Sequence, residues 1–239
     1  MTAITHRQLV ASLVMLVVAA FLASLLTGPS GIGLAEGLRA LVLGSADERQ
    51  ATVLIMREIR LPRAVLGALI GGVLGLAGAA LQGYLRNPLA EPGLIGVSGG
   101  ATFGAVLAIH SGAVGVSLLA LPLGGLLGGA VAVSVVMVLA GLRGGALTLI
   151  LAGVAVTSLT GALTALALNL SRNPFAATEI MFWLMGSLAD RSIVHVALAA
   201  ALIVPGAALL LSLGRALEAL TLGEEAAASL GVSLTTTRN

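Results

Sequence analysis

Four long stretches of this sequence carry no ionisable side chain, and they constrain its fold more than any other feature. No Asp, Glu, Lys, Arg or His occurs in residues 64–85, 93–109, 111–142 or 144–171. A helix that spans a membrane needs about 20 consecutive, mostly apolar residues. Only 9% of all residues are charged, whereas a soluble domain carries roughly 25%. No segment alternates apolar and polar residues as a transmembrane β-strand does. The sequence therefore predicts an all-α, polytopic membrane protein.

Six stretches are apolar and long enough to be predicted as membrane spans. They are residues 9–27, 62–83, 92–111, 115–141, 146–170 and 193–213. The mixed polar stretch 28–60 is expected to contain an amphipathic surface helix. The final stretch, 214–239, is amphipathic and polar and has no closing element, so we expect a chain that is cut off there. We predict a single transmembrane domain over residues 1–239.

The basic residues limit the chemistry that the chain can perform. All twelve are Arg, and Lys is absent. A phosphate-binding loop of the form GxxxxGK[ST] needs its Lys at the terminal phosphates, so any ATP hydrolysis must belong to another subunit. The net charge is only +2 and the arginines are scattered between apolar runs, which argues against nucleic acid as a partner.

Charge alone does not orient the chain in the membrane. If the N-terminus lies inside, the outer loops hold more arginines than the inner loops, which runs against the positive-inside rule. Either the orientation is inverted, or the outer arginines serve another purpose, such as docking an acidic partner.

The sequence offers neither an ion relay nor an active site. Proton-coupled carriers need ionisable residues inside their spans, and the four stretches above have none. There is no Cys, and His110 and His195 stand alone, so we expect no metal site and no cofactor. No carboxylate pair or Ser-His-Asp arrangement indicates catalysis. A channel or carrier that works without ATP, lined by hydroxyls and glycine backbone, stays open as an alternative.

Small residues recur at four-residue spacing in three of the predicted spans. Such rows make flat helix faces on which backbones approach closely in a membrane. They serve static packing, sliding between helices, or both. The rows are Gly67, Gly71 and Gly75; Gly124, Gly125, Gly128 and Gly129; and Gly153, Thr157, Gly161 and Ala165.

Two motifs are more specific than membrane composition. The first is RLPR at 60–63, followed after a glycine-rich span by QGYLRNPLAEPGLIGVSGGA at 82–101. The second is LEALTLGEEAAASLGV at 217–232. Both resemble the FecCD family of ABC-importer permeases, which take up iron-siderophore complexes, haem and vitamin B12. Residues 151–154 and 183–188 fit the same pattern, so the resemblance runs from about residue 9 to the end of the chain.

The resemblance implies a fold and a set of partners. Members look like ten-span type II importer permeases, so this chain is expected to hold about six spans, to lack the last four, and to carry short cytoplasmic coupling helices at 214–234. The implied partners are an ABC ATPase, a periplasmic binding protein, and a second permease copy, identical or closely homologous. The implied location is the bacterial inner membrane. The cargo would be an iron-siderophore, haem or related chelate, with vitamin B12 as the alternative.

The first motif supplies the residues expected at the two ends of the pathway. Arg60 matches the arginine that docks the binding protein, and Arg63 is its neighbour; a guanidinium suits paired contact with a carboxylate. Anchoring to lipid headgroups is the alternative. Asn87, Pro88 and Leu89 match the cytoplasmic gate, because proline disfavours helix at the residue before it. An ordinary tight loop is the alternative.

The fifth span and the second motif complete the expected site. The span that matches the family's pathway-lining helix carries the hydroxyls of Thr148, Thr157, Ser158, Thr160 and Thr164, and we expect Thr148, Thr157 and Ser158 to line the pathway. The second motif matches the helices on which the ATPase docks. Its apolar contacts are expected from Leu217, Leu220, Leu222 and Leu230, its polar rim from Glu218, Glu224 and Glu225, and its sharp turns from Gly223 and Gly231. A plain amphipathic surface segment is the alternative.

Overall fold

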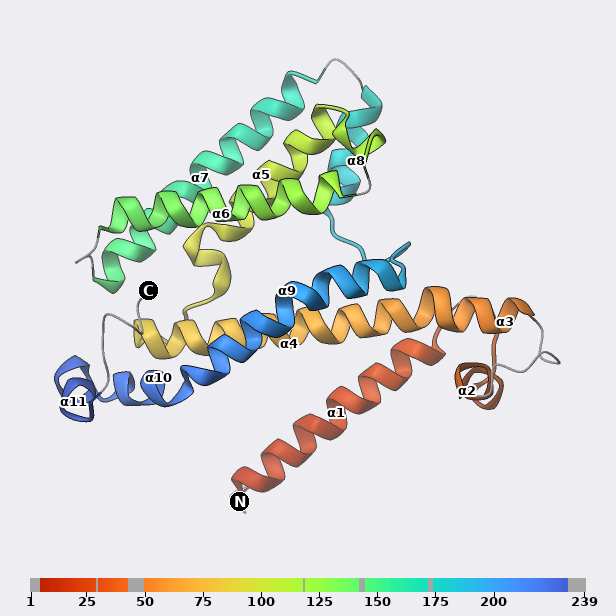
Figure 1. The fold of residues 1–239 in the computed structure, drawn as a ribbon, viewed down its shortest axis with the longest axis horizontal. Helices are drawn as coiled ribbons and strands as arrows, with labels where there is room; N and C mark the ends of the chain where they lie inside the picture. Colours follow the sequence, from red (N-terminus) through yellow and green to blue (C-terminus); the bar gives the residue numbers. More distant parts are fainter. Residues whose placement is uncertain are drawn as a thin grey trace. The chain divides into compact units, whose positions relative to one another are not determined.

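The chain forms two compact units. The computed structural model describes residues 5–28, 30–42, 50–117, 119–141, 145–171 and 174–231, and its regular elements there are all helical. One unit comprises residues 1–73 and 188–209, and the other residues 74–187 and 210–239. The all-α prediction is confirmed (Figure 1). That the chain forms a single domain stays a prediction.

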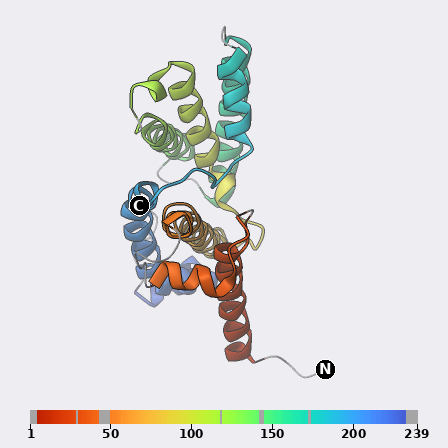
Figure 2. The ribbon, with the colours of Figure 1, turned by 90° about the vertical axis from the view of Figure 1, so that its right-hand side faces the viewer.

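Unit 1 begins with a helix that has a well-formed N-terminal cap. Helix α1 (His6–Leu26) starts at a capping box, in which the Thr5 hydroxyl accepts from the Gln8 amide and the Gln8 side chain accepts from the Thr5 amide. Such a box satisfies backbone donors that the first turn leaves unpaired. Helix α2 (Leu34–Val42) runs crosswise to α1 (Figure 2). It lies within the stretch where an amphipathic helix is predicted.

A continuous helical rod follows α2. It consists of α3 (Gln50–Leu54), a π-helical turn η1 (Ile55–Arg60) and α4 (Leu61–Leu85). Together, residues Ala51–Leu85 make an apolar helical segment of 35 residues. The boundary between the two units falls within α4, after Val73.

Unit 2 is built around three helices. The 3-10 turn η2 (Pro92–Ile95) leads into α5 (Val97–His110), and η3 (Ala113–Gly115) leads into α6 (Ala120–Ala140). Helix α7 (Ala146–Asn169) packs on both α5 and α6. Helix α8 (Pro174–Leu184) follows, and α9 (Ile193–Ser212) crosses the boundary between the units. The last elements are α10 (Gly214–Thr221) and α11 (Glu224–Ser229).

Helices α5 and α6 meet through their backbones. A Cβ atom added at Gly124 would lie 2.7 Å from the Gly104 carbonyl oxygen, and one added at Gly104 or Gly128 would overlap backbone of the facing helix. Gly100 is equally close to Gly128. The small-residue row predicted around Gly124 and Gly128 is therefore a packing face, as such rows are in membrane helices.

Five segments among the described residues are long and apolar enough to cross a membrane. They are His6–Leu26, Ala51–Leu85, Ala120–Ala140, Ala146–Asn169 and Ile193–Ser212. The remaining predicted span, 92–111, is instead a 3-10 turn followed by the 14-residue α5. A helix of that length reaches about 21 Å, less than the roughly 30 Å of a bilayer core. The break falls at Gly96, whose φ of 76° is left-handed and whose backbone lies against α7.

Candidate gate and coupling site

The predicted coupling segment folds as a helix–turn–helix. Helices α10 and α11 are joined at Gly223, whose φ of 110° and ψ of 157° are accessible to glycine alone. Gly231 follows α11 with a φ of 83°. Both glycines thus stand where the sequence predicts that a helix ends, in backbone conformations that favour glycine.

The predicted leucines of this segment divide into two groups. Leu220 is buried and Leu217 is half-buried, and both pack inward, whereas Leu222 is 70% exposed and Leu230 is 65% exposed. Glu218 is also exposed. The side chains of Glu224 and Glu225, and residues 232–234 of the predicted segment, lie outside the described residues. The exposed leucines of the predicted segment are therefore Leu222 and Leu230.

The inward-facing side chains meet the last turn of α4. Ala219, Leu220 and Ala227 form a buried cluster, against which Leu217 and Tyr84 pack. We call these five residues the coupling cluster. A Cβ added at Gly83 would lie 3.6 Å from the Leu217 Cβ, so the small residue at 83 lets α10 approach α4 closely.

The predicted gate residues follow this contact directly. The gate loop, residues 86–90, starts with Arg86 at a φ of 50°. The Asn87 side-chain oxygen accepts from the Leu89 amide at 2.9 Å, and the Asn87 carbonyl accepts from the Ala90 amide at 3.0 Å. Asn87 is therefore the residue that shapes the turn, as Asn commonly does through its own side chain. Pro88 and Leu89 are exposed.

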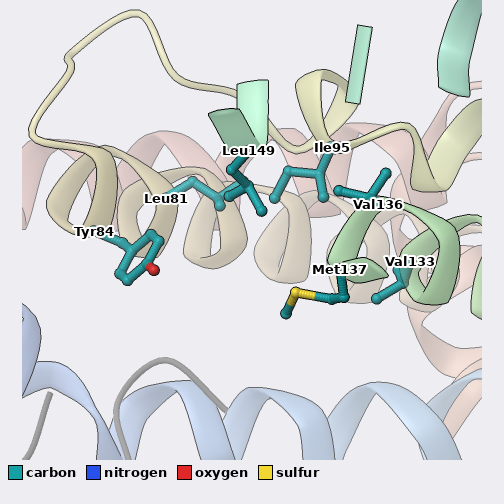
Figure 3. Close-up of a pocket in the computed structure, with 7 residues that line it drawn as sticks. All are labelled: Leu81, Tyr84, Ile95, Val133, Val136, Met137 and Leu149. Carbon is teal, nitrogen blue, oxygen red and sulfur yellow. The ribbon is translucent and has the colours of Figure 1, made fainter. Parts of the chain in front are cut away.

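A small apolar cavity lies beside the same turn of α4. It has a volume of about 180 Å³ (Figure 3). Tyr84 belongs both to its wall and to the coupling cluster. The lining residues are Leu81, Tyr84, Ile95, Val133, Val136, Met137 and Leu149. Tyr84, the single tyrosine of the chain, was not assigned a role from the sequence, although the motif at 82–101 contains it.

The predicted pathway hydroxyls do not share one face of α7. Thr148, Thr157 and Ser158 are all exposed. Thr148 and Thr157 are nine residues apart, which is about two and a half turns at about 3.6 residues per turn, so they point in opposite directions. The remaining two hydroxyls expected on this span, Thr160 and Thr164, are buried and bond to carbonyls of the preceding turn. The pathway role of Thr148, Thr157 and Ser158 stays a prediction.

The two arginines of the first motif have different surroundings. Arg63 is exposed, whereas Arg60 is only 6% exposed. Nη1 of Arg60 donates to the carbonyls of Leu25 and Leu26, each at 3.0 Å, and Nη2 donates to the Ser30 hydroxyl. The docking role predicted for this pair is untested; of the two, Arg63 has the accessible side chain.

Acidic, histidine and cysteine side chains do not gather at any of these places. Within the part of the chain that the structure describes, no group of three or more His, Cys, Asp or Glu residues could hold a metal ion.

Comparison with known proteins gives this arrangement a context. The chain matches the model of the FecCD transport family over residues 16–239. The ferric enterobactin transport permease FepD of Escherichia coli is 37% identical over 234 residues, covering 96% of this chain and 68% of that protein. The cobalamin import permease BtuC of Halobacterium salinarum is 41% identical over 185 residues, covering 77% of this chain and 49% of that protein.

One more relative and one solved structure are also ABC transporter proteins. The ABC transporter permease YvrB of Bacillus subtilis is 40% identical over 197 residues, covering 80% of this chain and 55% of that protein. An ABC transporter assigned to the metal-chelate type, solved in an inward-facing conformation, superposes with a TM-score of 0.79 at 30% identity, covering 98% of this chain and 70% of that chain. The matches span between 49% and 68% of the length of the three curated relatives. The chain belongs to the FecCD transport family.

Proposed function

We propose that the protein carrying this chain is the permease subunit of an ABC importer in the bacterial inner membrane. The observation that carries the proposal is the family match over residues 16–239. The cargo proposed first is an iron-siderophore, haem or related metal chelate, delivered by a periplasmic binding protein. A corrinoid is the second candidate, because the cobalamin permease of Halobacterium salinarum is 41% identical where the two align.

The chain acts as a conduit rather than as an enzyme. The sequence has no Lys, so it cannot form the phosphate-binding loop that ATP hydrolysis requires. An ATPase subunit supplies the energy, and a second permease copy, identical or closely homologous, completes the pathway. A lining of hydroxyls and backbone groups lets a bulky solute pass without holding it.

The coupling cluster supports a mechanical route from the ATPase to the gate. Leu222 and Leu230 are exposed for docking, while Leu217 and Leu220 hold the same segment to α4. Closure of the ATPase moves α10 and α11 as one body. Tyr84 transmits that movement to the last turn of α4, and Asn87, which shapes the gate loop, follows three residues later. Packed elements of this kind move in discrete steps rather than deforming continuously.

Cross-linking tests which surface meets the ATPase. Since the chain contains no Cys, a thiol introduced by Leu222→Cys is the single thiol within residues 1–239. We expect it to cross-link to the ATPase in the assembled transporter, whereas Leu220→Cys, which lies only 5% exposed in the same segment, serves as the matched control and should not. Cross-linking from position 220 and none from 222 would refute this docking surface.

Competition for uptake distinguishes the two cargo classes. In cells that depend on this transporter, an excess of unlabelled ferric siderophore should abolish uptake of its radioactive form, and cobalamin should leave that uptake unchanged. The reverse pattern identifies a corrinoid permease and overturns the first choice of cargo without affecting the proposed role as a permease.

A further inference from the structure

The π-helical turn η1 carries two arginines that bond to the ends of other helices. Arg60 donates from Nη1 to the carbonyls of Leu25 and Leu26, the last two residues of α1. Arg57 donates from Nη2 to the carbonyl of Leu41, in the last turn of α2, at 3.1 Å. Both acceptors therefore lie at helix C-termini.

Helix C-termini are favourable places for a cation. The last carbonyls of a helix have no partner within the helix, and the helix dipole places partial negative charge there. Helix α1 has no basic residue of its own in its last turn. Arg60 supplies the missing cation from 34 and 35 residues further along the chain.

The surroundings of Arg60 are shaped for its guanidinium. The side chain is 6% exposed, and among the described residues it donates to two carbonyls and to the Ser30 hydroxyl. Burying a charge is costly unless the group is hydrogen-bonded, and these three acceptors offset part of that cost. A Cβ added at Gly28 would lie 2.8 Å from Nη2, so the absence of a side chain there leaves room for the planar group.

Further contacts join η1 and the residues just before it to α2. Met56 is fully buried, and a Cβ added at Gly37 of α2 would lie 3.3 Å from its terminal methyl carbon. Thr52, just before the turn, donates to a carboxylate oxygen of Glu36 at 3.1 Å. The rod that becomes α4 thus touches α2 by packing and by hydrogen bonds within one short segment.

We propose that η1 is a tether, in which Arg60 caps the C-terminus of α1 and Arg57 caps that of α2. The tether fixes both helices to the start of α4. It gives a role to a π-helical turn, which is rare in proteins and frequent at functional places. The proposal makes Arg60 a positioning residue, and it does not depend on the proposed transport function.

Two buried positions report on the two caps separately. Leu25 is 4% exposed and Ala40 is fully buried, so thiols introduced there by Leu25→Cys and Ala40→Cys should react slowly with a maleimide in detergent micelles. Arg60→Gln should accelerate labelling at position 25 by about thirtyfold, the factor expected for losing hydrogen bonds from a charged donor. Labelling at position 40 should stay unchanged in that variant.

The reciprocal variant should show the reciprocal pattern. Arg57→Gln should accelerate labelling at position 40 by a smaller factor, since Arg57 is exposed, and leave position 25 unchanged. Arg63→Gln, which removes an exposed arginine next to the tether, is the matched control and should change neither rate. Gly28→Val displaces the guanidinium of Arg60 without removing its charge, so it should accelerate labelling at position 25 as Arg60→Gln does. It replaces Arg60→Gln in the test if Arg60→Gln does not fold.

Two results would overturn the tether. If Arg60→Gln and Gly28→Val both leave the rate at position 25 unchanged, the carbonyl bonds do not hold the end of α1. If either arginine variant accelerates both positions equally, the effect is a general loosening rather than capping of particular helices. Neither measurement involves uptake, so the tether can fail while the transport proposal stands.

Discussion

The tether in unit 1 and the glycine seam in unit 2 join helices in opposite ways. At the tether, long side chains from η1 reach the carbonyl ends of α1 and α2. At the seam, defined by Gly100, Gly104, Gly124 and Gly128, side chains are absent and the backbones of α5 and α6 touch. Hydrogen bonds from long arginine side chains tolerate small movements of the helices. Two helix backbones in direct contact leave no space for even one added carbon atom. The two regions should therefore fail under different substitutions.

The largest effect is expected at the seam. Gly104→Val forces a branched side chain onto the backbone of α6 and should lower the free energy of unfolding by about 3 kcal/mol, at the upper end for overpacking. Gly161→Ala is the control, because a Cβ there meets no atom within 4 Å. Denaturant unfolding in micelles, followed by circular dichroism, measures both. Equal stability of the two variants would mean that α5 and α6 do not meet through these glycines.

A smaller loss is expected at the tether. Arg60→Gln removes the charged donor and should cost about 2 kcal/mol, as for hydrogen bonds made by a charged group. Arg60→Lys keeps the charge but not the planar fork, so its stability should lie between those of the wild type and Arg60→Gln. The same unfolding assay applies. A lysine variant that is no more stable than the glutamine variant would show that charge contributes nothing to the cap.

At the turn between α10 and α11, we expect a substitution to change uptake. Gly223→Ala imposes a strained backbone at a φ of 110°, and uptake should fall about tenfold, since a residue held in such a region costs of order 1–3 kcal/mol. Gly214→Ala, in the same segment, is the control. A Cβ at position 214 meets no atom within 4 Å, so uptake should be unchanged. Membrane insertion of both variants should be normal. Full uptake by Gly223→Ala would separate this turn from coupling.

The smallest effect is expected at the exposed arginine of the first motif. Arg63→Glu should slow association with the binding protein a few-fold and alter its dependence on salt, as charges at the rim of an interface do. Arg215→Glu, an exposed arginine on α10, should change neither. Surface plasmon resonance at two ionic strengths gives both rates. An unchanged association rate for Arg63→Glu would remove Arg63 from the docking surface.

The helices and the seam illustrate what local sequence determines. Apolar length places α1, α6, α7 and α9 within a few residues, because a membrane span is set by composition over a window. The row at Gly124 and Gly128 predicts a flat face correctly. The spacing of small residues does not predict that Gly104 of α5 faces this row, because spacing within one helix carries no information about which helix packs against it.

The remaining differences come from contacts that are distant in sequence. Nothing near Arg60 indicates that its partners are the carbonyls of Leu25 and Leu26, 35 and 34 residues earlier. Helix α8 has only 11 residues, which is too few for a membrane span, so a search for long apolar stretches does not identify it. The division of the coupling leucines into inward Leu220 and outward Leu222 depends on how α10 lies against α4, which the pattern of leucines alone does not specify.

Solute uptake into proteoliposomes tests whether the chain forms a passage that is driven by a separate ATPase. Vesicles would hold the natural protein that carries this chain, with its ATPase inside and its binding protein with radioactive ferric siderophore or cobalamin outside. We expect accumulation of one of these solutes only when ATPase, ATP and binding protein are all present. Accumulation or equilibration in vesicles that lack the ATPase would contradict it, because the chain would then be a channel or a carrier that works alone.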